Sequence, residues 1–162
     1  MSLKQMMELC DAELNASSGI DVSLSGTTAV AAFLTGLNLT VGSLGDSRCI
    51  LGAIDSDGST LGEVGEIVAY QLSVDQKPHH QQELERIQRK GGKVAKLQNQ
   101  YGAHIGPYRV WTKDNVLGLA MSRSIGDAVG HSVGVQATPI TRRFQLQPGQ
   151  DHFLVLASDG VW

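Results

Sequence analysis

The sequence predicts an α+β fold with a largely antiparallel sheet, and three observations support that prediction. Glycine accounts for 19 of the 162 residues and proline for only 4, which indicates many tight turns. Most apolar residues fall in short runs that such turns separate, as in strands. Two segments show helical periodicity, so strands outnumber helices. The length fits one domain that can bury a sizeable core.

The first half of the chain begins as a predicted helix and continues as a meander of strands. Residues 4–15 place apolar side chains at mixed spacings of three and four, which is typical of an amphipathic helix. Short turns join the apolar runs of residues 28–36, 39–46 and 47–54. Residues 66–73 add a further strand. We therefore expect consecutive antiparallel strands over residues 28–73.

The clearest helix is predicted at about residues 79–90. Pro78 precedes it and Gly91 follows it, which is the usual distribution of these residues at helix ends. The densest basic cluster overlaps its end and is interleaved with acidic residues, so we interpret it as a solvated helix face. Its members are Arg86, Arg89, Lys90, Lys93 and Lys96.

The rest of the chain combines a long excursion with three apolar stretches. Residues 95–116 are mixed and polar, and long excursions in compact domains are often functional. The apolar stretches cover residues 116–127, 133–139 and 152–160, and small residues end each of them. We expect strands in these stretches.

Composition excludes several classes of protein. A net charge of −3 and a pI near 5.9 give no footprint for nucleic-acid binding. No apolar run approaches the roughly 20 residues that span a bilayer, and no secretory signal begins the sequence. Cys10 and Cys49 lie far apart in the sequence and show no metal-binding spacing. We expect two free thiols in a reducing compartment, the cytoplasm or the nucleus.

Three aspartates recur in one local setting, in which an apolar run ends beside glycine. They are Asp46 after Gly45, Asp127 after Gly126 and Asp159 before Gly160. Hard cations such as Mg²⁺ and Mn²⁺ prefer carboxylate oxygens and water, and carboxylates at strand ends can converge from distant parts of a chain. Taken singly, each aspartate fits an ordinary turn equally well, because Asp beside Gly is common turn chemistry.

Two other candidate metal sites are weaker. Asp55, Asp57 and Glu66 imitate the ends of a calcium loop, but a threonine stands where that loop needs glycine. His79, His80 and Glu83 could face one another on a helical turn. An exposed His-Glu pair without metal is the commoner outcome of such a spacing.

Taken together, five blocks resemble the type 2C family of metal-dependent serine/threonine protein phosphatases. In the family's order they are SGTTAV (25–30), VGSLGDSRCIL (41–51), LSVDQKPHHQQELERIQRKGGKV (72–94), LAMSRSIGD (119–127) and HFLVLASDGVW (152–162). The resemblance implies an antiparallel β-sandwich flanked by helices, with a metal centre at one end. It also implies that residues 95–116 form the family's variable flap.

The resemblance assigns roles to particular residues. Asp127 and Asp159 match metal-ligand aspartates, and Asp46 matches the aspartate of an additional metal site. Two or three Mn²⁺ or Mg²⁺ ions are implied in the complete domain, and a metal-activated water would hydrolyse phosphoserine or phosphothreonine on a protein. In the flap, Tyr108 and Trp111 are candidate contacts to the substrate protein, or they pack on their own domain.

The family's opening block has no match here, because no Asp-Gly-His occurs in the 162 residues. That block supplies the metal-bridging aspartate and a phosphate-gripping arginine. We therefore expect residues 1–162 to be part of a phosphatase domain that is incomplete at both ends. Alone, it should bind metal weakly or not at all and be inactive, and it should pair with the rest of the domain or self-associate. The rival hypothesis is a catalytically incompetent phosphatase-like binding or regulatory module.

Overall fold

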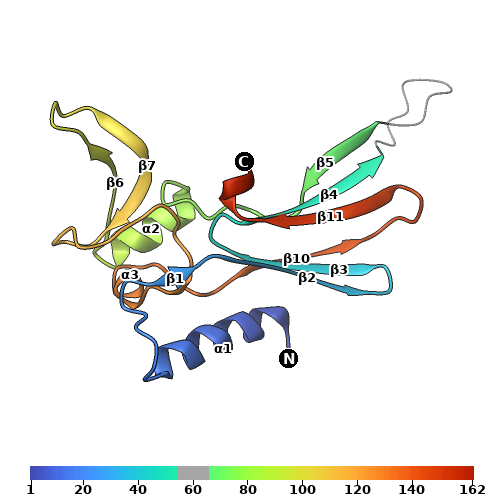
Figure 1. The fold of residues 1–162 in the computed structure, drawn as a ribbon, viewed down its shortest axis with the longest axis horizontal. Coiled ribbons are helices and arrows are strands. Elements are labelled where there is room, and N and C mark those ends of the chain that lie inside the picture. Colours follow the sequence, from blue (N-terminus) through green and yellow to red (C-terminus); the bar gives the residue numbers. More distant parts are fainter. Residues whose placement is uncertain (55–65) are drawn as a thin grey trace.

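The computed structural model describes residues 1–54 and 66–162, and it confirms the α+β class. Two three-stranded antiparallel sheets are stacked as a sandwich, and a separate hairpin stands beside them (Figure 1). One sheet has the order β10-β3-β2 and the other has the order β11-β4-β5. Among the described residues, none of the helices has the length and apolar character that a membrane crossing requires.

The six strands of the sandwich agree with most of the predicted runs. The first sheet consists of β2 (Ala29–Thr35), β3 (Asn38–Leu44) and β10 (Ile140–Gln145). The second consists of β4 (Arg48–Ile54), β5 (Ile67–Gln71) and β11 (Asp151–Ala157). Because β3 continues through a short turn into β4, the chain passes from one sheet to the other at that turn.

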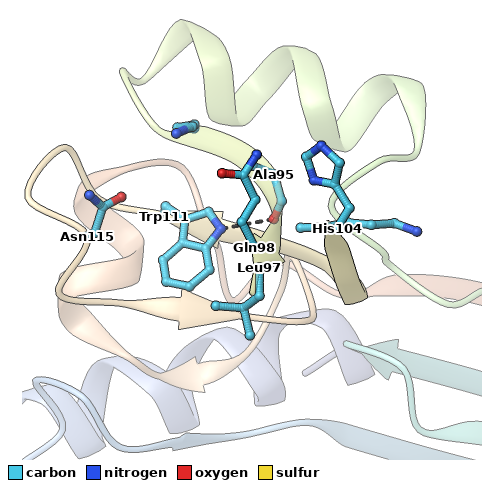
Figure 2. Close-up of a pocket in the computed structure, with 8 residues that line it drawn as sticks. Ala95, Leu97, Gln98, His104, Trp111 and Asn115 are labelled. Carbon is cyan, nitrogen blue, oxygen red and sulfur yellow. Dashed lines mark hydrogen bonds between the residues drawn. The ribbon is translucent and has the colours of Figure 1, made fainter. Parts of the chain in front are cut away.

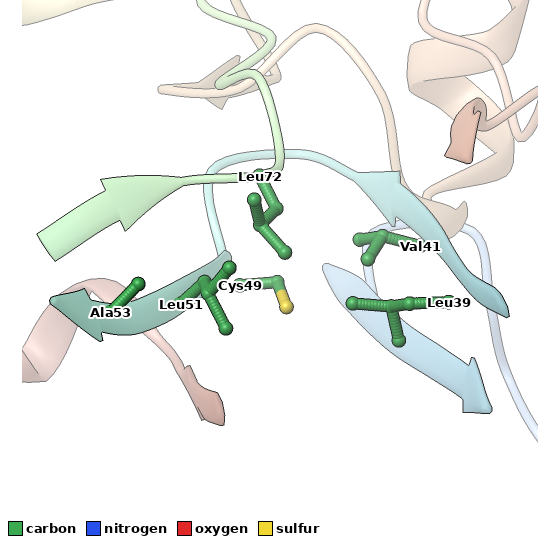
Figure 3. Close-up of a cluster of buried hydrophobic side chains, with 6 residues drawn as sticks. All are labelled: Leu39, Val41, Cys49, Leu51, Ala53 and Leu72. Carbon is green, nitrogen blue, oxygen red and sulfur yellow. The ribbon is translucent and has the colours of Figure 1, made fainter. Parts of the chain in front are cut away.

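Alternating side chains of β3 and β4 form the core between the two sheets (Figure 3). Successive side chains of a strand point to opposite faces, so every second residue points inward. The buried cluster consists of Leu39, Val41, Cys49, Leu51, Ala53 and Leu72. Burial at these positions fixes the register of both central strands, since a one-residue slip would expose the whole set.

Helix α1 (Leu3–Ala16) covers the outer face of the β10-β3-β2 sheet. Ser2 and Gln5 form a capping box at its start. Met7 is buried against Leu44, and a Cβ atom on Gly42 would lie 2.8 Å from a side-chain carbon of Leu3. The glycine in β3 therefore lets the helix approach the sheet closely.

The outer face of the β11-β4-β5 sheet is different, because it exposes apolar side chains. Ile67 is 52% exposed, Phe153 is 50% exposed and Val155 is 41% exposed. The ring of Phe153 lies over Gly52 of β4, where a Cβ atom would come within 2.4 Å of it. The expected fold has helices flanking the sandwich. Among the described residues, no helix covers this face.

The predicted helix at residues 79–90 is α2 (Gln81–Arg89), and a small sheet follows it. That sheet has the order β6-β7-β8, with β6 (Lys93–Gln98), β7 (His104–Trp111) and β8 (Gly118–Leu119). The prediction of a mixed excursion over residues 95–116 missed this hairpin. Basic and polar side chains on its exposed positions masked the apolar alternation.

Shorter elements complete the chain. The pair β1 (Gly26–Thr27) and β9 (Ile125–Gly126) joins two segments far apart in the sequence, with Gly26 opposite Gly126. Helix α3 (Ala128–Ser132) and the 3₁₀ helix η1 (Asp159–Val161) follow two of the predicted aspartate turns.

Two further expectations about secondary structure are wrong. Residues 133–139 form no named strand, although Val133, Val135 and Ala137 are buried there. The strand of this region is β10, where exposed Arg142 and Arg143 hide the alternation. The basic cluster is not a single helix face either, because Lys93 and Lys96 belong to β6.

Candidate active site

All three predicted aspartates lie at the same end of the sandwich. Asp46 is in the turn between β3 and β4, and Asp159 follows the end of β11. Strands β11 and β4 pair with Ala157 opposite Arg48, so Asp159 and Asp46 each lie two residues beyond the last pair of this ladder. Asp127 follows β9, which pairs with β1 just before β2 begins. The topology thus gathers strand ends from distant parts of the sequence.

Asp46 is buried, and its charge is already balanced. Its side chain is 6% exposed and forms an ion pair with Lys77. The neighbouring Ser47 shares a 2.8 Å hydrogen bond with Thr28 at the start of β2. Gly45 has a φ of 87°, a left-handed conformation that favours glycine. These contacts hold the Asp46 turn in one position.

Asp127 is the most constrained of the three aspartates. It has a φ of 50° and is 3% exposed. A Cβ atom on Gly26 would lie 2.2 Å from its Oδ2 atom, so only glycine fits at residue 26. Its carboxylate receives no hydrogen bond from the described residues. Such a carboxylate is available to a cation or to water.

Residues beside Asp127 fix its backbone. The Asp127 amide donates to the carbonyl oxygen of Ser25 at 2.8 Å. The Gly126 amide donates to Asp11 Oδ1 of α1, also at 2.8 Å. Helix α1 therefore supports the turn directly, in addition to covering the sheet.

Asp159 is exposed and begins η1. Nearby, the guanidinium carbon of Arg48 lies 4.7 Å from the ring centroid of Trp162, a cation–π arrangement. Arg48 also donates to both carboxylate oxygens of Asp75, at 3.0 and 2.9 Å. These hydrogen bonds, together with the Asp75 charge, raise the pKa of Arg48.

The fit of these residues to a metal centre is incomplete. Carboxylates beside glycine are the right donors for Mn²⁺ or Mg²⁺, and the partnerless Asp127 carboxylate suits a ligand. However, the described part of the chain contains no group of three or more His, Cys, Asp or Glu side chains that could hold a metal ion. Asp46 is also occupied by Lys77. The described residues alone therefore do not assemble the predicted two-metal centre.

Gln76 connects the Asp46 turn to the loop that precedes Asp127. Its side-chain oxygen accepts from the Gly45 amide, and its own amide donates to the Gly45 carbonyl at 2.8 Å. Its carbonyl oxygen accepts from both the amide and the hydroxyl of Ser122 at 2.9 Å. Gln76 is 1% exposed, so one buried residue spans the two regions.

Glu83 of α2 is the centre of a buried ion-pair cluster that anchors the same loop. Arg123 donates to Glu83 through Nε and Nη2, and Arg86 donates through Nη2 at 2.6 Å. The Ser122 hydroxyl adds a fourth donor group at 2.6 Å. Arg123 also donates to the carbonyl oxygen of Thr138. The cluster ties α2 to residues 122–138.

The hydrogen bonds of this cluster determine the charge state of Glu83. Burial alone would raise its pKa. Hydrogen bonds from Arg123, Arg86 and Ser122, with the Arg123 charge, outweigh burial and lower the pKa from 4.5 to about 2. Glu83 therefore stays ionised over the physiological pH range and keeps its arginine partners paired.

Both predicted flap aromatics lie on β7 and pack within their own subdomain. The Tyr108 ring lies 5.2 Å from the His79 ring and 5.1 Å from Lys96 Nζ. The Trp111 indole nitrogen donates to the carbonyl oxygen of Ala95 at 2.9 Å, and its ring packs against Gly118. Trp111 also lines a groove of about 430 Å³ beside β6 (Figure 2). Contact of either residue with a substrate stays a prediction.

The weaker metal candidates gain no support. His79 and His80 stack edge to face at 4.8 Å, while Glu83 is buried among arginines. The structure therefore contradicts a metal site formed by His79, His80 and Glu83. Of the calcium alternative, Asp55 and Asp57 lie outside the described residues.

Sequence reasoning missed Gln76, Glu83 and Arg123 as site-forming residues. A polar residue within a run of polar residues gives no sign that it is buried. One signal was present, because Glu83 and Arg86 stand at a spacing of three on a helix that ends beside Gly91. Arg123 could not be paired with them without the fold, since it lies 40 residues away.

With this geometry established, comparisons with known proteins agree on one family. Residues 3–162 match the family described as Protein phosphatase 2C. The chain is 42% identical over 154 residues to "Probable protein phosphatase 2C 12" of Oryza sativa subsp. japonica, covering 94% of this chain and 36% of that protein. It is 40% identical over 153 residues to "Probable protein phosphatase 2C 1" of Arabidopsis thaliana, covering 94% and 30%.

The fold agrees as well. A crystal structure of serine-threonine phosphatase 2C from Toxoplasma gondii superimposes with a TM-score of 0.82 at 26% identity, covering 99% of this chain and 50% of that one. The chain therefore spans about a third of the two curated relatives and half of the solved structure. The family is metal-dependent and acts on phosphoproteins. On the match of residues 3–162, this chain belongs to the protein phosphatase 2C family.

Proposed function

We propose that residues 1–162 form part of the catalytic domain of a metal-dependent protein serine/threonine phosphatase. The observation that carries the proposal is the convergence of Asp46, Asp127 and Asp159 at one end of the sandwich. The buried cluster around Glu83 and the hydrogen bonds of Gln76 support it, because they fix the turn that contains Asp46 and the loop that precedes Asp127. The membership in the phosphatase 2C family supports the reaction type.

The proposed roles follow from the contacts. Asp127 would be a metal ligand, since its buried carboxylate has no donor among the described residues. Asp159 would be a second ligand, because its exposed position at the same end leaves it accessible. Asp46 would serve an additional site only after Lys77 releases it. Two or three bound Mn²⁺ or Mg²⁺ ions would supply an activated water as the nucleophile.

The metal ions would need further carboxylates that the described residues do not bring to this end. We therefore propose that the 162-residue chain alone binds Mn²⁺ weakly or not at all. It would hydrolyse p-nitrophenyl phosphate no faster than a metal blank. The activity would belong to a longer polypeptide that contains this chain.

The test compares two proteins. A longer polypeptide that includes residues 1–162 should show Mn²⁺-dependent hydrolysis of a phosphothreonine peptide, and Asp127→Asn and Asp159→Asn should each remove most of it. Asp114→Asn is the matched control, since this exposed aspartate lies in the turn after β7. Isothermal titration with Mn²⁺ gives a second readout, in which Asp127→Asn weakens binding. Equal activity and equal Mn²⁺ affinity in all variants would refute the proposed roles.

One observation favours the rival function, a phosphatase-like binding or regulatory module. Asp46 is neutralised by Lys77, and no three-ligand group forms among the described residues. If the longer polypeptide neither binds Mn²⁺ nor hydrolyses the peptide, the binding module is the better description.

We also propose that the exposed face of the β11-β4-β5 sheet is covered in the working protein. Ile67, Phe153 and Val155 are the exposed apolar residues of that face, and such patches usually mark contact surfaces. The rest of the domain, or a second copy, would cover it. Size-exclusion chromatography of the 162-residue chain should then show self-association, whereas a compact, stable monomer would count against it.

The proposed location is the cytoplasm or the nucleus. Cys10 is exposed and Cys49 is buried, and both are free thiols. Free exposed thiols persist in reducing compartments. Imaging of a fluorescent fusion of the longer polypeptide tests this proposal, and an extracellular signal would contradict it.

A further inference from the structure

The charge of this acidic chain is strongly divided along the sequence. Residues 86–113 contain seven of its 13 Lys and Arg residues and none of its 16 Asp and Glu residues. The remainder therefore has six basic and 16 acidic side chains. A block of 28 residues with a charge of +7 stands in a protein of net charge −3.

Two of the seven cations serve the fold. Arg86 belongs to the Glu83 cluster, and Arg109 donates to the carbonyl oxygen of Gly118 at 2.6 Å. The other five form no ion pair within residues 1–54 and 66–162, and of these Lys96 also lies over the Tyr108 ring. We call them the basic surface, and its members are Arg89, Lys90, Lys93, Lys96 and Lys113.

The five cations are neighbours in the structure. Arg89 and Lys90 end α2, and Lys93 begins β6. Lys93 pairs with Trp111 across the hairpin, which places Lys113 two residues further on. A Cβ atom on Gly91 would lie 3.6 Å from the Cε atom of Lys113. The basic surface is therefore continuous from the end of α2 to the start of the hairpin.

A groove opens directly beside these charges. Its volume is about 430 Å³, and its lining combines apolar and basic side chains (Figure 2). Those that matter for binding are Lys93, Lys96, Leu97, His104 and Trp111. None of the described residues that line the groove is acidic. The adjacent strand β6 is an edge strand of its described sheet, since the strand order is β6-β7-β8.

We propose that the basic surface and this groove bind an acidic, extended segment of the phosphoprotein substrate. Charge complementarity selects the occupant, because unpaired lysines beside an apolar groove attract carboxylates while the groove accepts an apolar side chain. A free strand edge suits an extended chain. This inference rests on the proposed phosphatase function for its ligand class, and it adds a preference for acidic sequence around the phosphorylated residue.

The first experiment measures binding in the full chain with EDTA present, so it needs no activity. The probe is a fluorescein-labelled phosphothreonine peptide rich in glutamate, compared with the same peptide carrying glutamine instead. Fluorescence anisotropy should show tighter binding of the acidic peptide by about tenfold, and the difference should fall as salt increases. Lys93→Gln with Lys96→Gln should remove most of that difference.

The matched control is Arg142→Gln with Arg143→Gln, which removes two exposed cations from β10. It changes net charge equally and should leave the peptide preference intact. Circular dichroism should show that both double variants remain folded. Equal loss in both double variants would overturn the proposal, because a general charge effect would then explain the binding. Equal or tighter binding of a single-stranded RNA or a phosphatidylserine vesicle would overturn it as well.

A second experiment separates this proposal from the proposed function. In the longer polypeptide with Mn²⁺, Lys93→Gln with Lys96→Gln should raise KM for the acidic peptide about tenfold and leave p-nitrophenyl phosphate hydrolysis unchanged. If no variant hydrolyses either substrate but the acidic peptide still binds, the phosphatase function fails and the binding surface stands. If both substrates are hydrolysed without any effect of the lysines, the surface fails and the function stands.

Discussion

The Glu83 cluster and the basic surface both include residues of α2, yet they treat charge in opposite ways. Around Glu83, both arginines are paired and the carboxylate is 4% exposed. On the basic surface, five cations have no ion pair among the described residues. Buried charges need partners because desolvation is costly, whereas exposed charges do not. The first region therefore stabilises the fold, whereas binding is the role that we propose for the second.

The substitution with the largest expected effect on stability is Glu83→Ala, which tests the structural role of the Glu83 cluster. It would leave buried Arg123 and half-buried Arg86 without their carboxylate, and removing one partner of a buried ion pair costs about 3–5 kcal/mol. Urea unfolding should therefore show a large loss of stability. Glu85→Ala is the control, because Glu85 is exposed on the same helix and should cost no more than about 0.5 kcal/mol. A similar small cost for both variants would show that the cluster is not structural.

The next largest effect is expected when the pH is lowered, because Glu83 then becomes protonated. The pKa of Glu83 is about 2 in the folded chain, against 4.5 ordinarily. Because the folded pKa is depressed, the stabilisation is present above pH 4.5 and is lost as the pH falls towards 2. The expected loss is about 3 kcal/mol.

Measuring unfolding against pH for the unsubstituted chain and for Glu83→Gln isolates this contribution from other carboxylates. The stability difference between them should shrink between pH 4.5 and pH 2. A constant difference over that range would contradict the depressed pKa.

Ser122→Ala should have an intermediate effect. It removes a hydroxyl that bridges Glu83 and the carbonyl oxygen of Gln76, and losing buried hydrogen bonds of this kind costs about 1–2 kcal/mol. Thermal unfolding measures it. Ser132→Ala is the control, since that hydroxyl is exposed and bonds only within its own helical turn. Equal shifts in melting temperature for the two variants would show that the hydrogen bonds of Ser122 do not stabilise the cluster.

The smallest effect on stability is expected at the basic surface. Lys93→Gln with Lys96→Gln should change the free energy of unfolding by no more than about 0.5 kcal/mol, because neither lysine has an ion pair among the described residues. The same urea experiment measures it. A loss above 2 kcal/mol would mean that these lysines stabilise the fold, and the contrast with Glu83 would disappear.

The sequence predicted the sandwich strands well where apolar residues alternate and turns are short. Residues 39–46 and 47–54 are examples, since β3 begins one residue before the first run and β4 lies within the second. It failed at β6, β7 and β10. Lysine and arginine weaken the alternation in β6 and β10, and Gly106 and Pro107 interrupt it in β7. Tertiary pairing decides such strands, as β10 shows by pairing with β3 over six residues.

Only the three aspartates of the candidate site could be predicted from the sequence. Aspartate beside glycine identified Asp46, Asp127 and Asp159, and the fold brings all three to one end. The supporting residues were not predictable, because Gln76 and Arg123 acquire their roles through partners 30 to 40 residues away. Long-range polar pairing leaves no periodic pattern in one sequence.

Gln76 also has a consequence for how this region opens. The amides of Gly45, Gln76 and Ser122 all bond through this one residue. Opening any one of these hydrogen bonds requires Gln76 to move and so disrupts the others. In hydrogen exchange the three amides should therefore lose protection together, as one cooperative unit that joins two segments far apart in the chain.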